Sequence, residues 1–220
     1  SMFHDDEGRK YIVSMVTDHR IPKKYAGRLV MQEFDAGNHK MIAPVKEIYA
    51  ANDIFLEGPH IFKRRGWYYL FSADTGTGEL HGQTIQRSRH IWGPYEMYRP
   101  DYDAFRQKGE AYSIMTSRHH EDILLQKAGH CDLVETQDGE WYVVHLCGRA
   151  SKERNCQDAK RFAGSRRYMI GRETAIQKMR WTEDDWLVLD NGTVVPQEMV
   201  EAPKCADQAK EEVAYQKLVR

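Results

Sequence analysis

Several features that mark common protein classes are missing from this sequence of 220 residues. No apolar run approaches the roughly 18–20 residues of a membrane-spanning helix, so we expect no membrane partner. Lys and Arg number 32 and Asp and Glu number 33, and the net charge of −1 gives no electrostatic case for binding nucleic acid. The four cysteines form neither a CxxC pair nor a dense disulfide pattern, and no signal-peptide pattern precedes the first predicted strand. We therefore expect reduced thiols and a cytoplasmic protein.

Sustained helical periodicity is also absent from the first 200 residues, and glycine-closed hairpin patterns take its place. Three stretches share a short apolar-alternating segment, a polar turn that ends in glycine, and a tyrosine three positions later. The glycine–tyrosine pairs are Gly8 and Tyr11, Gly66 and Tyr69, and Gly139 and Tyr142. A weaker fourth copy lies at 176–189, where Asp185 replaces the glycine.

The spacing of these hairpins predicts a β-propeller. The turn glycines are 58 and 73 residues apart (66 − 8 and 139 − 66), which suits one blade plus loops. Residues 28–49 resemble an outer hairpin, and residues 79–97 resemble a strand that runs out to a Trp-Gly-Pro corner. We expect an all-β fold, an incomplete β-propeller of about four blades over 1–200, followed by a linker or short helical tail over 201–220.

Glu57 is the first candidate for chemistry, because it stands between an apolar pair and a Gly-Pro turn at the start of a predicted strand. A glutamate in a turn is ordinarily a solvated surface acid. Here Gly58 permits close approach of another segment, and Pro59 removes a backbone donor. A carboxylate at the inner start of a propeller strand points at the axis, where such folds hold their ligands. Glu57 is therefore a candidate general acid.

His130 and Arg172 also precede apolar stretches that are predicted strands. The alternative for His130 is a histidine satisfied by hydrogen bonds in the core. We interpret Glu57, His130 and Arg172 as the starts of three successive repeats, which would place them around one axial pocket. Histidine and arginine donate hydrogen bonds to hydroxyl oxygens, so the pattern predicts a polyhydroxylated ligand.

Five stretches, taken in order, are similar to glycoside hydrolase family 43, in its β-xylosidase and α-L-arabinofuranosidase branch. They include "LEGPHIFKRRGWYYLFSADTGTG" at 56–78, "KAGHCDLVETQDGEWYVVHLCGR" at 127–149 and "GRETAIQKMRWTEDDWL" at 171–187. The resemblance implies a five-bladed propeller and inverting hydrolysis of β-1,4-xylosides or arabinofuranosides in hemicellulose. It also implies roles for four residues. Glu57 matches the general acid, His130 the axial histidine and Arg172 the sugar-binding arginine, while Thr77 lies in a loop that lines the pocket.

Inverting hydrolysis needs a second carboxylate that activates water, roughly 6.5–9.5 Å from the first. The resemblance puts that base, and an aspartate that orients the acid, ahead of Ser1. We therefore expect an N-terminally truncated chain that lacks the C-terminal β-sandwich and hydrolyses xylosides weakly or not at all. Asp5 and Asp6 belong to a hairpin turn and are expected to face solvent. Two alternatives stay open: an inactive carbohydrate-binding or assembly propeller, and a partner chain that supplies the carboxylate.

The sequence gives no case for a cofactor. The family sometimes places calcium or water at the propeller axis beside His130, but one neutral histidine with few nearby carboxylates makes a poor calcium site. The expected partner is a xylo-oligosaccharide or arabinosyl substrate, and the sequence does not separate the two sugars. A homo-oligomer is a further hypothesis, because an incomplete propeller exposes sheet edges and apolar faces.

Overall fold

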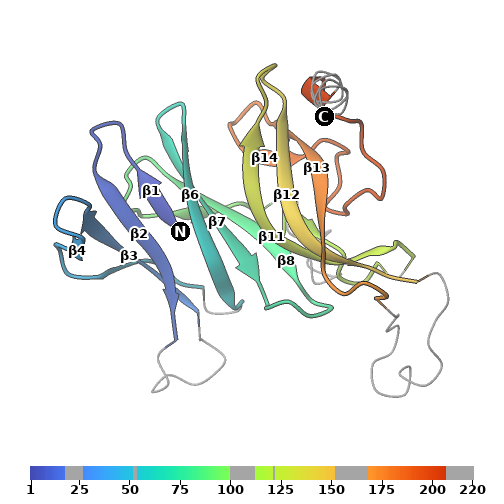
Figure 1. Cartoon of the computed structure of the whole chain (residues 1–220), viewed down its shortest axis with the longest axis horizontal. Coiled ribbons are helices and arrows are strands. Elements are labelled where there is room, and N and C mark those ends of the chain that lie inside the picture. The colour runs from blue at the N-terminus through green and yellow to red at the C-terminus, as the bar shows by residue number, and fades with distance from the viewer. Residues whose placement is uncertain (18–26, 52–53, 100–111, 121, 152–167, 207–220) are drawn as a thin grey trace, which may run out of the picture.

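The computed structural model describes residues 1–17, 27–51, 54–99, 112–120, 122–151 and 168–206. In these ranges, antiparallel strands form three sheets that lie side by side, with the second sheet in the middle (Figure 1). The first sheet contains β1 (Met2–His4), β2 (Lys10–Val16), β3 (Arg28–Asp35), β4 (Lys40–Met41) and β5 (Lys46–Tyr49). The second contains β6 (Leu56–Arg64), β7 (Trp67–Asp74), β8 (Gly82–Ser88), β9 (Glu96–Met97) and β10 (Met115–Thr116). The third contains β11 (Leu125–Glu135), β12 (Trp141–Arg149), β13 (Glu173–Trp181) and β14 (Leu187–Leu189).

The strand order within each sheet largely follows the chain. The main paths run β1-β2-β3-β4, β6-β7-β8-β10 and β11-β12-β13-β14, while β5 pairs with β3 and β9 pairs with β8. The strand that opens each sheet is therefore an edge strand. β6 packs against the first sheet, and β11 packs against the second sheet. Near the start of β6, Gly58 lies against the ring of His130, which stands in the middle of β11.

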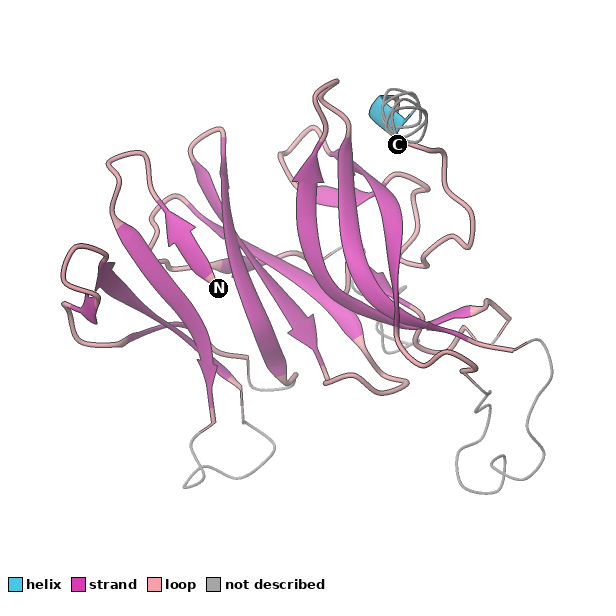
Figure 2. Cartoon of the chain, in the orientation of Figure 1, coloured by secondary structure: helices cyan, strands magenta, loops and turns pink. Residues whose placement is uncertain are grey.

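The predicted all-β fold and incomplete propeller are confirmed, and Figure 2 shows that strands dominate the described chain. The expected count of about four blades is wrong for these residues, which form three sheets. The predicted fourth hairpin exists as β13 and β14, but β13 also pairs with β12 from Glu173 to Met179. It therefore extends the third sheet instead of starting another.

The three glycine-closed hairpins form as predicted. Gly8, Gly66 and Gly139 have φ values of +81°, +74° and +75°, which glycine adopts without the clash that a Cβ causes. Each tyrosine three positions later is at most 1% exposed. Their hydroxyl groups donate to the Asp5 carboxylate (3.3 Å), the Asp185 carbonyl (2.6 Å) and the Glu201 carbonyl (3.4 Å), for Tyr11, Tyr69 and Tyr142 respectively.

The second sheet is covered on both faces, and its central strand β7 shows why. Successive side chains of a strand point to opposite faces. Tyr69 and Phe71 lie in the core shared with the third sheet, whereas Leu70 lies in the core shared with the first. All three are fully buried, and each such side chain stabilises the fold by roughly 1.5–3 kcal/mol. The two cores hold β6 and β11 in place at the candidate site.

The predicted tail is described only at its start. Residues 205 and 206 have helical backbone, and 207–220 lie outside the described residues, so the expected domain boundary at 200 stays a prediction. In the part of the chain that the structure describes, no helix has the length and apolar character needed to cross a membrane.

Candidate functional site

Two bulged edge strands, β6 and β11, meet at the candidate site. In β6 the pairing with β7 shifts by one residue between Glu57 and His60, where Gly58 has a φ of +54°. In β11 the pairing with β12 shifts on both sides of Gly129. His130 follows directly, in the left-handed region at φ +52°. Bulges re-aim side chains and are common beside active sites, which is why this pair of edges carries the candidate residues.

The backbone of Gly58 lies directly against the ring of His130. A methyl group at Gly58 would lie 2.5 Å from Nε2 of His130, closer than side chains pack. The ring of His60, the first paired residue after the bulge, has its centre 6.1 Å from the centre of the His130 ring. Burial lowers the pKa of His60, so its uncharged form is favoured beside His130. The close approach expected at Gly58 is therefore confirmed, and His130 is the segment that approaches.

Glu57 is half-buried and pairs with Ala73 across the β6–β7 hairpin. The loop that follows β7 passes beside its carboxylate: a methyl group on Gly76 would lie 3.7 Å from Oε1 of Glu57. Thr77 is the next residue of this loop and is exposed. The loop between β7 and β8 therefore covers one side of the candidate acid.

His81 ends this loop and is completely buried. Burial lowers its pKa to about 4, against the opposing effect of hydrogen bonds that the ring makes to the backbone of Asp74 and Gly76. The charges of Arg172 and His130 lower the pKa further. The positive charges of Arg172 and His130 therefore both disfavour the protonated form of His81.

A polar bridge connects the same loop with the turn that carries Arg172. The carboxylate of Glu79 pairs with Nζ of Lys127 at 3.1 Å and accepts a hydrogen bond from the Tyr168 hydroxyl at 3.1 Å. Lys127 also lies over the Tyr168 ring, 4.1 Å from its centre. The Tyr168 carbonyl accepts from the amide of Gly171, which closes the turn just before Arg172. The bridge thus joins a loop of the second sheet to the third sheet.

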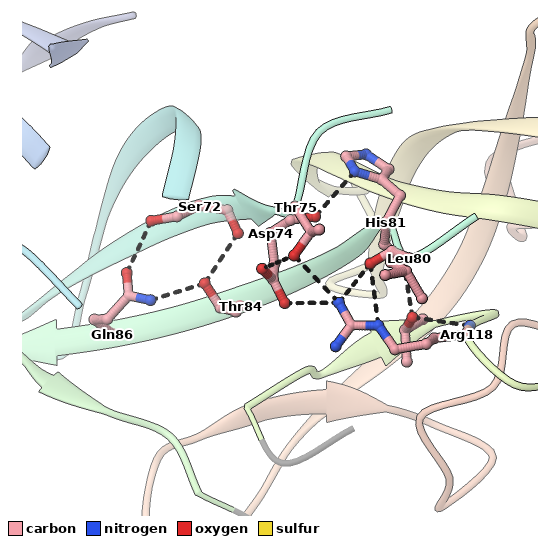
Figure 3. A network of polar contacts seen from close by, with 9 residues as sticks. Ser72, Asp74, Thr75, Leu80, His81, Thr84, Gln86 and Arg118 are labelled. Carbon is pink, nitrogen blue, oxygen red and sulfur yellow. Dashed lines mark hydrogen bonds and ion pairs between the residues drawn. The ribbon is translucent and has the colours of Figure 1, made fainter. Parts of the chain in front are cut away.

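Buried polar side chains support the second sheet beside this loop (Figure 3). Ser72 donates to Gln86 at 3.0 Å, and Gln86 donates in turn to Thr84 at 2.8 Å. At the end of β7, the side chain of Asp74 is 2% exposed and pairs with Arg118 at 2.9 Å. Buried polar groups of this kind are stable only when hydrogen-bonded, so the network fixes the end of β7.

The structure groups the predicted site residues, although not for the reason expected. Glu57, His130 and the loop that carries Thr77 lie together, and the hydrogen bond from Tyr168 to Glu79 joins this loop to the turn that precedes Arg172. The interpretation of three equivalent repeat starts is wrong for Arg172. Glu57 and His130 belong to the first strands of the second and third sheets, whereas Arg172 directly precedes the third strand of the third sheet.

The expectation for the turn aspartates is half correct. Asp6 is 78% exposed and pairs with Lys63. The side chain of Asp5 is only 5% exposed, because it accepts hydrogen bonds from the amides of Glu7 (3.0 Å) and Arg9 (2.8 Å) and pairs with the Arg9 side chain. Asp5 therefore stabilises its own hairpin turn and is not directed to solvent.

Several residues around the site were not predicted from the sequence: His81, Glu79, Lys127, Asp74 and Arg118. His81 offered a local signal, because it stands between the loop after β7 and the strand β8. The others are recognised only through partners far away in the chain. Among the described residues, no group of three or more His, Cys, Asp or Glu side chains is arranged to hold a metal ion.

Comparison with known proteins agrees with this arrangement. The family model described as glycosyl hydrolases family 43 matches residues 1–187. A xylosidase/arabinosidase 43B from Humicola insolens is 44% identical over 211 residues, which cover 96% of this chain and 35% of the relative. A β-xylosidase from Bacillus subtilis is 40% identical over 187 residues, covering 84% of this chain and 32% of the relative. The chain thus spans about a third of the length of these curated relatives.

Solved structures show the same relationship. The crystal structure of a xylan β-1,4-xylosidase from Bacillus halodurans superposes with a TM-score of 0.78 at 42% sequence identity, and the match covers 93% of this chain and 35% of that protein. A family 43 protein from Bacillus licheniformis superposes with a TM-score of 0.69 at 31% identity, over 93% of this chain and 33% of that one. The family model spans most of the chain, and the chain belongs to glycosyl hydrolases family 43.

Proposed function

We propose that this chain contributes the acid side of a pocket that cleaves β-1,4-xylosides or arabinofuranosides with inversion. Glu57 protonates the oxygen of the departing group, and His130, Arg172 and Thr77 bind the sugar. The observation that carries the proposal is the contact at Gly58, because the bulge that sets the direction of Glu57 also admits the ring of His130. Family membership and the names of the relatives support a xyloside or arabinoside substrate.

The acid acts on one of the two bonds that change. In inverting hydrolysis the glycosidic C–O bond breaks as a carboxylic acid transfers its proton to the departing oxygen. Water attacks the opposite face of the sugar, and a second carboxylate takes a proton from that water. We infer that this second carboxylate comes from outside the described residues. The carboxylates at the end of β7 and in the loop that follows it support this inference, because Asp74 is paired with Arg118 and Glu79 with Lys127.

The same engaged carboxylates favour a second candidate, a carbohydrate-binding propeller without turnover. Such a protein keeps the donors that hold hydroxyl groups and lacks the group that activates water. Binding and chemistry therefore have to be measured separately. Homo-oligomer formation and a cytoplasmic location also stay predictions.

The test is to supply a nucleophile that needs no base. We expect the purified chain to bind xylobiose and to hydrolyse it weakly or not at all in plain buffer. With sodium azide, we expect xylobiose to give α-D-xylosyl azide and xylose, because azide attacks without losing a proton while Glu57 protonates the departing sugar. In the Glu57→Gln variant the amide cannot donate that proton, so azide product falls by about 100-fold or more while xylobiose still binds.

The matched control is Glu135→Gln, an exposed glutamate at the far end of β11, which should leave azide product unchanged. Azide product that is unaffected by Glu57→Gln would contradict the role of the acid. Efficient hydrolysis in plain buffer, abolished by Glu57→Gln, would contradict the absence of a base. Binding without azide product would favour the carbohydrate-binding module, and failure to bind xylobiose would contradict both functions for a xyloside ligand.

A further inference from the structure

We propose that Arg118 is a positioning residue for Glu57: its guanidinium group pins both ends of the loop at 75–80, so that Gly76 is held beside the acid. The inference rests on the proposed function of Glu57 as proton donor. It extends that function to a residue 61 positions further along the chain (118 − 57) that acts through the loop.

The guanidinium group contacts both ends of the loop (Figure 3). At the first end, Nη2 of Arg118 pairs with the Asp74 carboxylate at 2.9 Å and lies 3.5 Å from the Thr75 hydroxyl. At the second end, Nε donates to the Leu80 carbonyl at 3.1 Å, and Nη2 donates to the same oxygen. One planar guanidinium group thus links the two ends of the loop, an arrangement that we call the clasp.

Arg118 is itself fixed from behind. Its amide donates to the Thr116 hydroxyl at 3.1 Å, and that hydroxyl donates to the His81 carbonyl at 2.8 Å. Nδ1 of His81 lies 3.2 Å from the Asp74 carbonyl. The backbone of Arg118 is therefore held by hydrogen bonds, which fixes the position from which its side chain contacts the loop.

The loop conformation requires such support. Thr75 has a φ of +63°, a left-handed conformation that side chains with a branched Cβ rarely adopt. Strained backbone of this kind persists only where surrounding contacts fix it. The Thr75 amide donates to the Phe55 carbonyl at 2.8 Å, two residues before Glu57, and Gly76 then lies against the Glu57 carboxylate. A displacement of the loop at Thr75 would therefore change the surroundings of the Glu57 carboxylate.

The buried contacts of the guanidinium group with Asp74 and Leu80 require an arginine at position 118. The side chains of Arg118 and Asp74 are 13% and 2% exposed, and a pair this buried is strongly destabilised when one partner is removed. A lysine at 118 keeps the charge. Its compact ammonium group lacks the planar fork that reaches a carboxylate and a carbonyl from fixed directions. Arg118→Lys thus removes the clasp while retaining the pairing charge for Asp74.

The direct test is amide hydrogen exchange of the loop. The amides of Thr75 and His81 report on it, because they donate to the Phe55 and Gly78 carbonyls. We expect both to exchange about tenfold faster or more in Arg118→Lys, since local opening sets their protection. The amide of Gly139 in a distant hairpin turn should be unchanged. Unchanged exchange at Thr75 and His81 would overturn the proposal.

The chain offers a closely matched control. Arg64 pairs with Asp185 at the same distance of 2.9 Å, also partly buried, at the opposite end of β6 from Glu57. Arg64→Lys makes the same chemical change, and it should leave exchange at Thr75 and His81 as in the unmodified chain. Equal acceleration by Arg64→Lys would show a general loss of stability and would overturn the specific role. Asp74→Asn, which keeps the shape of the partner, gives a second variant should Arg118→Lys fail to fold, and it should loosen the same two amides.

A rate ratio tests whether the loop positions the acid. Xylobiose needs a proton on its departing sugar, whereas p-nitrophenyl β-xyloside has a leaving group that departs with little help. In the presence of azide, we expect the ratio of kcat/KM for xylobiose to that for the aryl xyloside to fall about tenfold in Arg118→Lys and to stay constant in Arg64→Lys. A loosened loop with an unchanged ratio would overturn the positioning of Glu57. If the unmodified chain acts on neither substrate, the proposed function fails, and the exchange measurement still decides whether Arg118 holds the loop.

Discussion

Gly58 controls the direction of two functional side chains through its own backbone. Its left-handed φ of +54° creates the bulge that separates Glu57 from His60, and its missing side chain leaves room for the His130 ring. A residue with a Cβ meets two separate penalties at this position, one from the backbone and one from the ring. These penalties can be separated by experiment, because other turn glycines meet only the first.

Gly58→Ala should destabilise the chain more than a turn glycine does. The left-handed backbone costs about 1–2 kcal/mol for alanine, and displacing the His130 ring adds about 1–3 kcal/mol. Gly8→Ala is the matched control, because Gly8 has a φ of +81° and no atom within 4 Å of an added methyl group. Urea unfolding of the two variants measures the difference. Equal losses of unfolding free energy would show that the His130 ring moves aside without cost.

Single residues were predictable from the sequence where the signal is local. Glu57 and Gly58 stand in one short motif from which the close approach at Gly58 was predicted, whereas the role of Glu57 as an acid stays a prediction. Arg118 could not be found in this way, because its partners Asp74 and Leu80 are 44 and 38 residues away. Lys127 likewise meets Glu79 only through the packing of β11 on the second sheet.

The hairpins show how a short motif stabilises an element. The tyrosine three positions after each turn glycine is buried, and its hydroxyl reaches an acceptor outside its own strand. For Tyr69 that acceptor is the Asp185 carbonyl in the turn between β13 and β14, which ties the second sheet to the third. Burial, together with the charge of Asp185, raises the pKa of Tyr69 to about 12, so the hydroxyl remains a donor at neutral pH.

Tyr69→Phe should therefore lower the free energy of unfolding by about 1–2 kcal/mol, because the carbonyl of the half-buried Asp185 loses its donor while the ring still packs. Tyr142→Phe is the comparison, since its hydrogen bond to the Glu201 carbonyl is longer, 3.4 Å against 2.6 Å, and a smaller loss is expected. Urea unfolding at neutral pH measures both. A larger loss for Tyr142→Phe would contradict the importance of the link between sheets.

The elements themselves were predicted better than their assembly. The glycine-to-tyrosine spacing correctly identified each hairpin, because turn chemistry and strand alternation act within a few residues. The number of blades was overestimated because a hairpin pattern does not say which strand it pairs with. The pairing of Trp141 with Met179, 38 residues apart (179 − 141), is what places β13 in the third sheet.

Two buried histidines make the stability of the whole molecule sensitive to acidic pH. His81 and His145 are at most 1% exposed, and burial lowers the pKa of each to about 4. His145 lies within the third sheet, with Nδ1 3.1 Å from the Leu146 carbonyl. Both folded-state pKa values lie below the ordinary value of about 6.5. The unfolded chain therefore binds protons that the folded chain does not bind as pH falls below about 6.5.

The sign of the resulting pH dependence follows from this difference. Stability should be highest above about pH 6.5 and fall as pH decreases toward about 4, by up to about 1.4 kcal/mol per pH unit for each histidine. The urea midpoint should thus drop between pH 7.5 and pH 5. His145→Leu removes one of the two groups, so its midpoint should fall less over the same range, even if the variant differs in stability at pH 7.5. A midpoint that stays constant from pH 7.5 to pH 5 in the unmodified chain would contradict neutral, buried histidines, because no proton uptake would then accompany unfolding.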